Sequence, residues 1–182
     1  MGGYTLEGSL GLRPVTECKI YTEYTVDADQ AAEINKFEPV YMLATGEIAA
    51  WTPSTGILPI GVAIEKASAT PGSGVKIVVC EDPAQIYEIA SDAAWDSEAA
   101  LLAASDNEWF TMVMSDNSNG QSTAKLDTDG TDDGADAQYI LKIIGKSTKV
   151  GNVAATTAGC FVKVRIHTLF QHRALAAPDP ST

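Results

Sequence analysis

The feature that most constrains this chain is a succession of short apolar runs, each interrupted by glycine or proline. Residues 57–79 read ILPIGVAIEKASATPGSGVKIVV, so two apolar runs flank the turn-forming segment SATPGSG. Proline supplies a fixed φ and glycine a positive φ, which favour a tight chain reversal. We therefore predict a β-hairpin with strands at residues 57–64 and 75–79. Inside the first strand, Gly61 indicates a bulge or the close approach of another backbone.

The same pattern continues on both sides of this hairpin. We predict further strands at residues 39–45, 47–51, 85–89, 109–114, 139–144 and 161–169. In the last of these, Val162, Val164 and Ile166 alternate with Lys163, Arg165 and His167, so one face is expected to meet the core. Strands about ten residues apart that are separated by glycine and proline are typical of antiparallel sandwiches and small barrels.

One segment departs from the strand pattern. Residues 91–105 read SDAAWDSEAALLAAS, which is rich in helix formers and begins with capping residues. Trp95, Ala99, Leu102 and Ala103 fall on one helical face, so we predict a short helix here. The predicted fold class is mainly β: an antiparallel β-sandwich or small barrel with one short helix and an extended N-terminal arm.

The two ends of the chain differ from its middle. We divide the sequence into an extended N-terminal arm and lead-in (1–37), a β-rich core domain (38–172) and a small polar C-terminal tail (173–182). The first 20 residues contain five glycines or prolines among scattered apolar residues, so this arm is expected to be disordered or laid on a neighbour. Its candidate partner-binding anchors are Tyr4, Leu6, Leu10 and Leu12.

The charge of the chain narrows its possible partners. The formal net charge is −12, from 24 acidic and 12 basic side chains. An acidic surface repels phosphate backbones and anionic lipids, which argues against nucleic acid and membrane partners. No apolar stretch approaches the about 20 residues that span a bilayer. The N-terminus has no basic start followed by an apolar run, so the chain is expected to remain in the compartment where it is made.

The basic residues are unevenly distributed along the chain. Six of them gather in the last third, while the acids concentrate earlier: Lys142, Lys146, Lys149, Lys163, Arg165 and Arg173. This asymmetry suits complementary contact between copies or with a neighbour, and it also suits scattered surface charges. The sequence leaves both interpretations open.

Three cysteines, Cys18, Cys80 and Cys160, lie far apart in the sequence. An odd number without a CxxC spacing argues against a disulfide framework and against a zinc site. Cys80 and Cys160 each adjoin a β-rich run, so we expect buried free thiols there.

The remaining candidates for chemistry are weak. The acidic run 127–133 (DTDGTDD) could attract calcium, but an EF-hand loop starting at Asp127 has Asp132 and Gln138 where glycine and glutamate are needed. We interpret it as part of a solvated loop over residues 115–136. His167 and His172 would lie on opposite faces of a strand. Phosphate-binding, dinucleotide-binding, GxSxG and HExxH motifs are absent from the sequence. We therefore predict no catalytic, cofactor or metal residues and no enzymatic activity.

Three blocks of the sequence carry a family resemblance. They are residues 57–94, residues 117–128 (NSNGQSTAKLDT), and the closing pair 137–152 and 159–172, which ends in VKVRIHTLFQH. Their order resembles the bacteriophage capsid cement, or head decoration, proteins. The resemblance implies a β-rich virion protein on the capsid exterior, made in the host cytoplasm. It implies binding to the major capsid protein, commonly as homotrimers, without catalysis. The N-terminal arm and the tail after His172 have no counterpart in it.

Two alternatives stay open at this point. Another virion structural component, of the tail or baseplate, would share the fold class and be present in few copies. A carbohydrate-binding β-sandwich module would need aromatic side chains on one plane, and the candidates are Trp51, Trp95 and Trp109.

Overall fold

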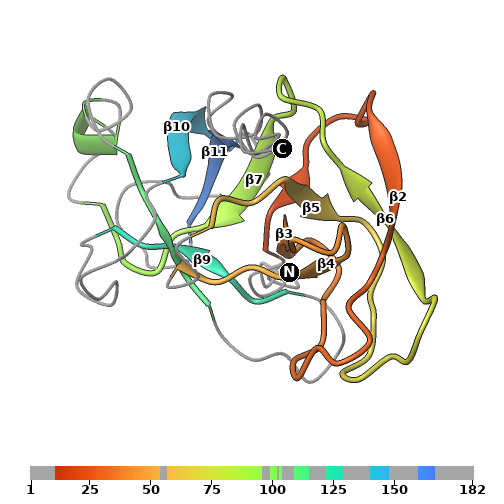
Figure 1. Ribbon diagram of the computed structural model, residues 1–182. Helices are drawn as coiled ribbons and strands as arrows, with labels where there is room; N and C mark the ends of the chain where they lie inside the picture. Colours follow the sequence, from red (N-terminus) through yellow and green to blue (C-terminus); the bar gives the residue numbers. More distant parts are fainter. Residues whose placement is uncertain are drawn as a thin grey trace, which may run out of the picture.

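A computed structural model of the protein describes residues 11–53, 57–95, 99–101, 103, 109–114, 122–128, 140–147 and 160–166. In these residues the protein is mainly β, with antiparallel sheets and one short helix that includes residues 99–101 (Figure 1). The predicted fold class is confirmed, and the arrangement of the sheets is consistent with a β-sandwich.

A five-stranded antiparallel sheet forms the first lobe. Its order is β2 (Tyr21–Thr25), β6 (Lys76–Cys80), β5 (Gly61–Ala63), β3 (Pro39–Met42) and β4 (Ile48–Ala50). The two outer strands meet at one end, where Val26 and Ile48 form a parallel bridge and the Asp27 N–H donates to the Ile48 carbonyl (2.9 Å). The sheet therefore curls until its two edges touch, which places one of its faces inside a small barrel.

The interior of this barrel is aliphatic. On β6, Ile77 and Val79 are buried while Lys76 is exposed, as the alternation of side chains along a strand requires. The buried cluster consists of Val26, Ile34, Val40, Ile48, Ile60, Ala63, Ala67, Ile77 and Val79. Its members come from β3, β4, β5 and β6, from residues next to β2 and β5, and from the bridge between Ile34 and Ala67. The core therefore holds the curled sheet together.

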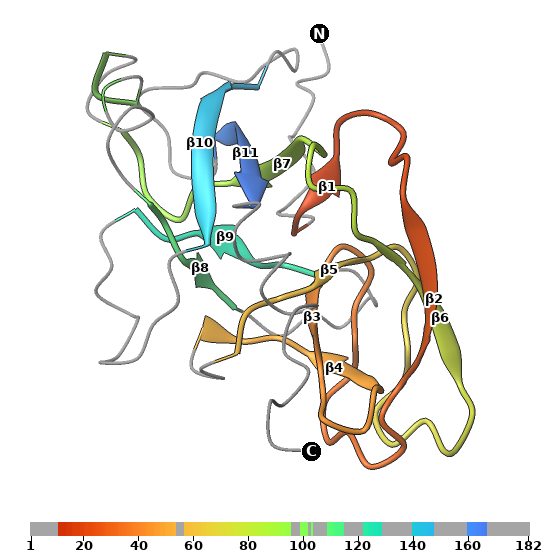
Figure 2. The same cartoon turned by 45° about the horizontal axis from the view of Figure 1, so that its top comes forward.

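A four-stranded sheet and a separate strand pair form the second lobe. The sheet order is β1 (Arg13–Pro14), β7 (Tyr87–Ala90), β11 (Phe161–Ile166) and β10 (Leu141–Lys146). The pair is β8 (Met112–Val113) with β9 (Lys125–Leu126). Leu126 of β9 forms a bridge with Ser91, which follows β7. Phe110, two residues before β8, forms a bridge with Leu141 of β10. Figure 2 shows the second lobe above the first.

The second core extends into the first lobe. It contains Tyr87, Ile89, Val162 and Val164 from the four-stranded sheet. The same cluster includes Leu12, Cys18, Trp51, Val62 and Cys80, of which the last three belong to or follow strands of the first lobe. The indole N–H of Trp51 donates to the Ile57 carbonyl (2.7 Å), so its one polar atom is satisfied inside this core.

The predicted strands are confirmed in type, with bounds that differ by a few residues. β5 and β6 are antiparallel neighbours, and β3 and β4 pair across a turn in which Gly46 has φ +84°. Gly61 marks a close backbone approach, as predicted, because a Cβ atom there would lie 2.4 Å from the Cys80 carbonyl oxygen. The other predicted strands overlap β7, β8, β10 and β11, although β7 ends one residue and β10 two residues beyond the predicted range. The described helix residues lie within the range predicted for the helix.

Two segments differ from the predictions. The described part of the predicted arm and lead-in, residues 11–37, contains β1 and β2, which pair with β7 and β6. Within the predicted solvated loop, residues 125–126 form β9 and Ala124 and Leu126 are buried. In both segments pairing with distant strands decides the structure, and local composition cannot reveal that pairing.

Candidate interaction surface

The outer edge of both lobes is one continuous stretch of chain, residues 13–25, which we call the edge ribbon. β1 is the outermost strand of the four-stranded sheet and pairs with β7, and β2 is the outermost strand of the five-stranded sheet and pairs with β6. Two segments of six residues each, 15–20 and 81–86, separate the two ladders. Because the two spacers are equal, both ladders keep one register as the ribbon crosses between the lobes.

The edge ribbon concentrates exposed apolar side chains. Val15 is 40% exposed, Ile20 48% and Tyr21 47%, and these are three of the five large exposed hydrophobic residues in the described part of the chain. An outermost strand also offers a row of backbone groups that its own sheet does not pair. The combination of unpaired backbone and apolar side chains is suited to binding an extended segment of another protein.

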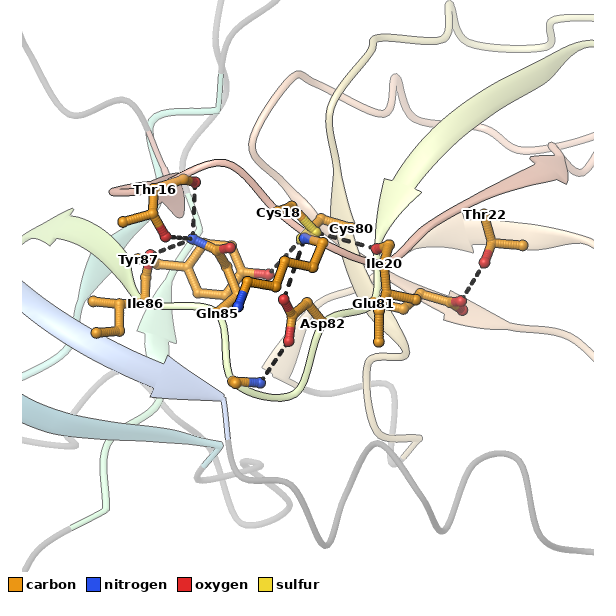
Figure 3. Close-up of a disulfide and its surroundings, with 12 residues drawn as sticks. Thr16, Cys18, Ile20, Thr22, Cys80, Glu81, Asp82, Gln85, Ile86 and Tyr87 are labelled. Carbon is orange, nitrogen blue, oxygen red and sulfur yellow. Dashed lines mark hydrogen bonds between the residues drawn. A yellow bond between two sulfur atoms is a disulfide. The ribbon is translucent and has the colours of Figure 1, made fainter.

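A disulfide between Cys18 and Cys80 fixes the point where the ribbon crosses between the lobes (Figure 3). This corrects the expectation of free thiols: β2 and β6 bring the two residues together, and the third cysteine, Cys160, is buried and free. An odd number of cysteines leaves one unpaired, but it does not exclude a disulfide between the other two.

Hydrogen bonds surround the disulfide on both sides. The Lys19 N–H donates to the Asp82 carboxylate (3.2 Å), and the Glu81 N–H donates to the Ile20 carbonyl (3.0 Å). The Gln85 amide donates to the Thr16 carbonyl (3.2 Å), which Figure 3 shows beside the disulfide. These contacts hold the spacer of the ribbon against the spacer between β6 and β7, so the exposed side chains are presented by ordered backbone.

Two tyrosines beside the crossing are held in their neutral form. Burial raises the pKa of Tyr24, and its hydrogen bond to Glu81 and the charge of that carboxylate raise it further. The Tyr24 hydroxyl donates to Glu81 Oε1 (2.5 Å), and the Thr22 hydroxyl donates to Oε2 of the same carboxylate (2.5 Å). Burial likewise raises the pKa of Tyr87, followed by the charges of Asp82 and Tyr21. Because both pKa values are raised, neither phenol loses its proton near neutral pH. We therefore interpret Tyr24 and Tyr87 as structural residues.

The predicted arm anchors fall into two groups. Leu12 is completely buried in the second core, and its N–H donates to the Phe37 carbonyl (2.9 Å). This corrects its assignment as a partner-binding anchor, because its side chain contributes to the protein's own core. Tyr4, Leu6 and Leu10 lie outside the described residues.

The candidates for metal binding are not brought together in the described part of the chain. No group of three or more His, Cys, Asp and Glu residues is placed there to hold an ion. Asp127 is buried after β9, while residues 129–133, His167 and His172 lie outside the described residues.

Cys160 sits in a buried polar contact. Its sulfur is 3.2 Å from the Ser91 hydroxyl, and burial raises the pKa of its thiol, partly offset by its hydrogen bonds. A raised pKa disfavours the thiolate that nucleophilic chemistry needs.

Within the described ranges, no helix has the length and apolar character needed to cross a bilayer.

The three tryptophans do not form one exposed platform. Trp51 is fully buried. Trp95 packs edge-on against Phe110 with ring centroids 5.9 Å apart, and Trp109 lies under the ammonium of Lys142 at 5.6 Å. A carbohydrate platform that includes Trp51 is therefore inconsistent with the structure.

Sequence reasoning missed the edge ribbon. The signal was present as the β-branched and aromatic run IYTEYTV at residues 20–26, which is typical of a strand.

In the comparisons with known proteins, no protein-family model matches this chain, and no curated protein matches it either.

Proposed function

We propose that this protein is a structural virion component that binds the outer surface of a bacteriophage capsid and stabilises the lattice of the major capsid protein. The observation that carries the proposal is the edge ribbon, which is outermost in both sheets among the described residues and exposes three apolar side chains. The resemblance of residues 57–94, 117–128, 137–152 and 159–172 to capsid cement proteins supports the same function.

The edge ribbon suits a shell-binding protein for a physical reason. An extended segment of a capsid protein could add to β2 or β1 as a further strand, with backbone hydrogen bonds supplying affinity. Val15, Ile20 and Tyr21 would lose exposed apolar surface in that contact, which stabilises it. Repetition over many copies converts a weak single contact into substantial stability of the shell.

The proposal includes partners and location. The protein acts on the capsid exterior after synthesis in the host cytoplasm, it self-associates as a homotrimer, and it needs no cofactor. Residues 1–20 reach a capsid protein or a sister subunit through Tyr4, Leu6 and Leu10, which directly precede the edge ribbon. The net charge of −12 keeps the protein away from the packaged genome.

The first experiment measures the copy number of this chain in purified particles by quantitative mass spectrometry against the most abundant shell protein. A ratio within a few-fold of one to one supports the proposed function as a capsid cement protein. A handful of copies per particle assigns the chain to the tail or baseplate instead. Absence from particles overturns the virion proposal and favours a binding module, which glycan-array binding then tests.

A second experiment tests the edge ribbon directly. The double variant Ile20→Asp/Tyr21→Asp places charges on the ribbon, and we expect at least tenfold weaker binding to shells stripped of this protein. Ile57→Asp is the matched control, because Ile57 is 45% exposed and lies outside the ribbon. Full shell binding by the double variant would show that the ribbon is not the docking surface.

A further inference from the structure

The backbone of β2 presents hydrogen-bonding groups along the outer edge of the five-stranded sheet. In an antiparallel ladder, residues that bond to the neighbouring strand alternate with residues whose N–H and C=O groups point to the other side. At one end of the β2–β6 ladder, the Glu81 N–H donates to the Ile20 carbonyl (3.0 Å). At the other end, the Val26 N–H donates to the Val75 carbonyl (2.8 Å). The even-numbered residues of β2 therefore bond to β6, and its odd-numbered residues face outward.

Tyr21 and Glu23 are outward-facing residues of β2. Because β2 is outermost among the described strands of its sheet, the backbone N–H and C=O groups of both residues lack a partner strand within the described part of the chain. Beyond Thr25 the edge is occupied, since the Asp27 N–H donates to the Ile48 carbonyl (2.9 Å). The stretch from Tyr21 to Thr25 is therefore the part of this edge that can accept another strand.

β1 does not present a comparable edge. The Val15 N–H donates to the Ile86 carbonyl (2.9 Å), so the odd-numbered residues of β1 bond to β7 and the even-numbered ones face outward. Of these, Leu12 already donates its N–H to the Phe37 carbonyl (2.9 Å), and Pro14 has no N–H to donate. A strand placed beside β1 would find no backbone donor at either position, which makes β2 the better edge for strand addition.

The outward-facing residues of β2 also determine what a partner strand should carry. Tyr21 and Glu23 are two residues apart, so their side chains project to the same face, and both are exposed. A residue of an added strand that lies opposite either of them projects to that face as well, directly beside it. An apolar residue would cover the ring of Tyr21, and a basic residue two positions away would meet the carboxylate of Glu23.

Glu23 already has one cation nearby, on the inner side of the strand. Its Oε2 lies 3.1 Å from Lys76 Nζ, in a pair whose side chains are 59% and 52% exposed. Exposed pairs of this kind contribute little to stability, because water screens both charges. Lys76 belongs to β6, so a cation on an added strand would approach the carboxylate from the opposite side of β2.

We propose that an extended segment of the capsid protein binds as an additional strand beside β2, with an apolar residue next to Tyr21 and a lysine or arginine next to Glu23. This inference rests on the proposed function and narrows it from either strand of the edge ribbon to β2. Backbone hydrogen bonds supply affinity, and the two side-chain positions select the segment. The net charge of −12 favours a basic segment over an acidic one.

Hydrogen exchange of the unbound full chain, followed by NMR, tests whether the edge is open. We expect the amides of Tyr21 and Glu23 to exchange at least tenfold faster than those of Thr22 and Tyr24, which bond to β6. Equal protection of all four amides would mean that another segment covers this edge, which overturns the inference.

The same amides report on the bound state. When the chain binds shells stripped of this protein, hydrogen exchange with mass spectrometry should show at least tenfold slower exchange at Tyr21 and Glu23. Binding without this protection would overturn the inference and leave the proposed function intact. Failure of the wild-type chain to bind the shells would overturn the proposed function and, with it, the named partner.

Three matched variants test the basic residue of the partner. Glu23→Gln removes the carboxylate, Lys76→Gln breaks the same ion pair from its other side, and Glu33→Gln removes an exposed acid outside the edge ribbon. We expect Glu23→Gln to weaken shell binding at least fivefold and the other two to preserve it. Equal weakening by Lys76→Gln would assign Glu23 to the ion pair alone, and equal weakening by Glu33→Gln would assign the effect to net charge. Either result contradicts the proposal.

A proline tests the outward N–H group itself. Glu23→Pro removes this donor without removing a bond to β6, and Glu23→Ala is the control that keeps it. We expect Glu23→Pro to bind shells at least tenfold more weakly than Glu23→Ala, with a similar melting temperature. Equal binding by the two variants would show that no partner strand uses this N–H. A large fall in the melting temperature of Glu23→Pro alone would place the N–H in the β6 ladder, which also contradicts the proposal.

Discussion

Cys18 and Cys80 are bonded with their Cα atoms 6.2 Å apart, although 62 residues separate them in the chain. The bond lies between the β1–β7 and β2–β6 ladders, where the edge ribbon passes from one lobe to the other. Both residues belong to the second core, and Cys80 also ends β6 of the first lobe. One covalent link therefore joins the two lobes at the only segment of the ribbon without ladder pairing.

The first prediction concerns the stability that this bond provides. Closing a loop of this length should stabilise the fold by about 4 kcal/mol, through restriction of the unfolded chain. We expect Cys18→Ala/Cys80→Ala to lower the free energy of unfolding by about that amount, measured by urea denaturation. Wild-type protein with the bond reduced is the control and should fall to a similar midpoint. An unchanged midpoint in both samples would contradict the prediction.

The second prediction concerns when the bond forms, and it rests on the proposed virion location. The cytosol keeps thiols reduced, so Cys18 and Cys80 should be alkylated when infected cells are quenched in denaturant that contains an alkylating agent. In released particles, peptide mapping without reductant should recover the linked peptide. Cys160 is free, so it should be alkylated in both samples under the same denaturing conditions. A linked peptide inside quenched cells would refute this order of events.

The third prediction concerns Gly11, which lies where the two lobes meet. Its φ is +63°, and a Cβ atom would lie 2.5 Å from the Phe37 carbonyl oxygen and 2.6 Å from Ser122 Cβ. We expect Gly11→Ala to destabilise the protein by about 3 kcal/mol, from backbone strain and from the displaced neighbours.

Gly72→Ala is the control for this substitution. Gly72 has φ +84° with nothing within 4 Å of a Cβ, so it should show the strain alone, about 1 kcal/mol. Equal losses for the two variants in urea denaturation would show that the contact between the lobes is not tight at Gly11.

The fourth prediction concerns alkaline pH. The pKa values of Tyr24 and Tyr87 are raised in the fold, so the unfolded chain loses these protons first. Their contribution to stability is complete below the ordinary tyrosine pKa of about 10 and is lost as the pH rises above it. Absorbance at 295 nm should therefore show two of the six tyrosines ionising only with unfolding. Ionisation of all six near pH 10 with the fold intact would contradict this.

A variant assigns part of that behaviour to one residue. Tyr24→Phe removes the hydrogen bond to Glu81 and should cost about 1 kcal/mol at neutral pH. The same variant should lose less stability than the wild type between pH 10 and pH 12, since it carries one fewer phenol with a raised pKa. A steeper alkaline loss in the variant would place the sensitivity elsewhere.

Local pattern determined much of the fold of this protein. Alternation along residues 161–166 predicted which side of β11 is buried, and the glycines and prolines between apolar runs predicted the turns at Gly46 and beyond residue 64. Gly61 was recognised because a glycine inside a strand has few explanations besides close packing. These features depend on neighbours a few residues away, and such neighbours are visible in the sequence.

Only the tertiary structure decided the candidate surfaces. The burial of Leu12, the bond between Cys18 and Cys80 and the strand at residues 125–126 all depend on partners tens of residues away. The register that sets Lys142 opposite Arg165 likewise depends on the pairing of β10 with β11. The sequence by itself determined which residues prefer strands, because side-chain periodicity is local. Which strands are neighbours, and hence which edge and which charges face outward, followed from the long-range pairing that buries the two cores.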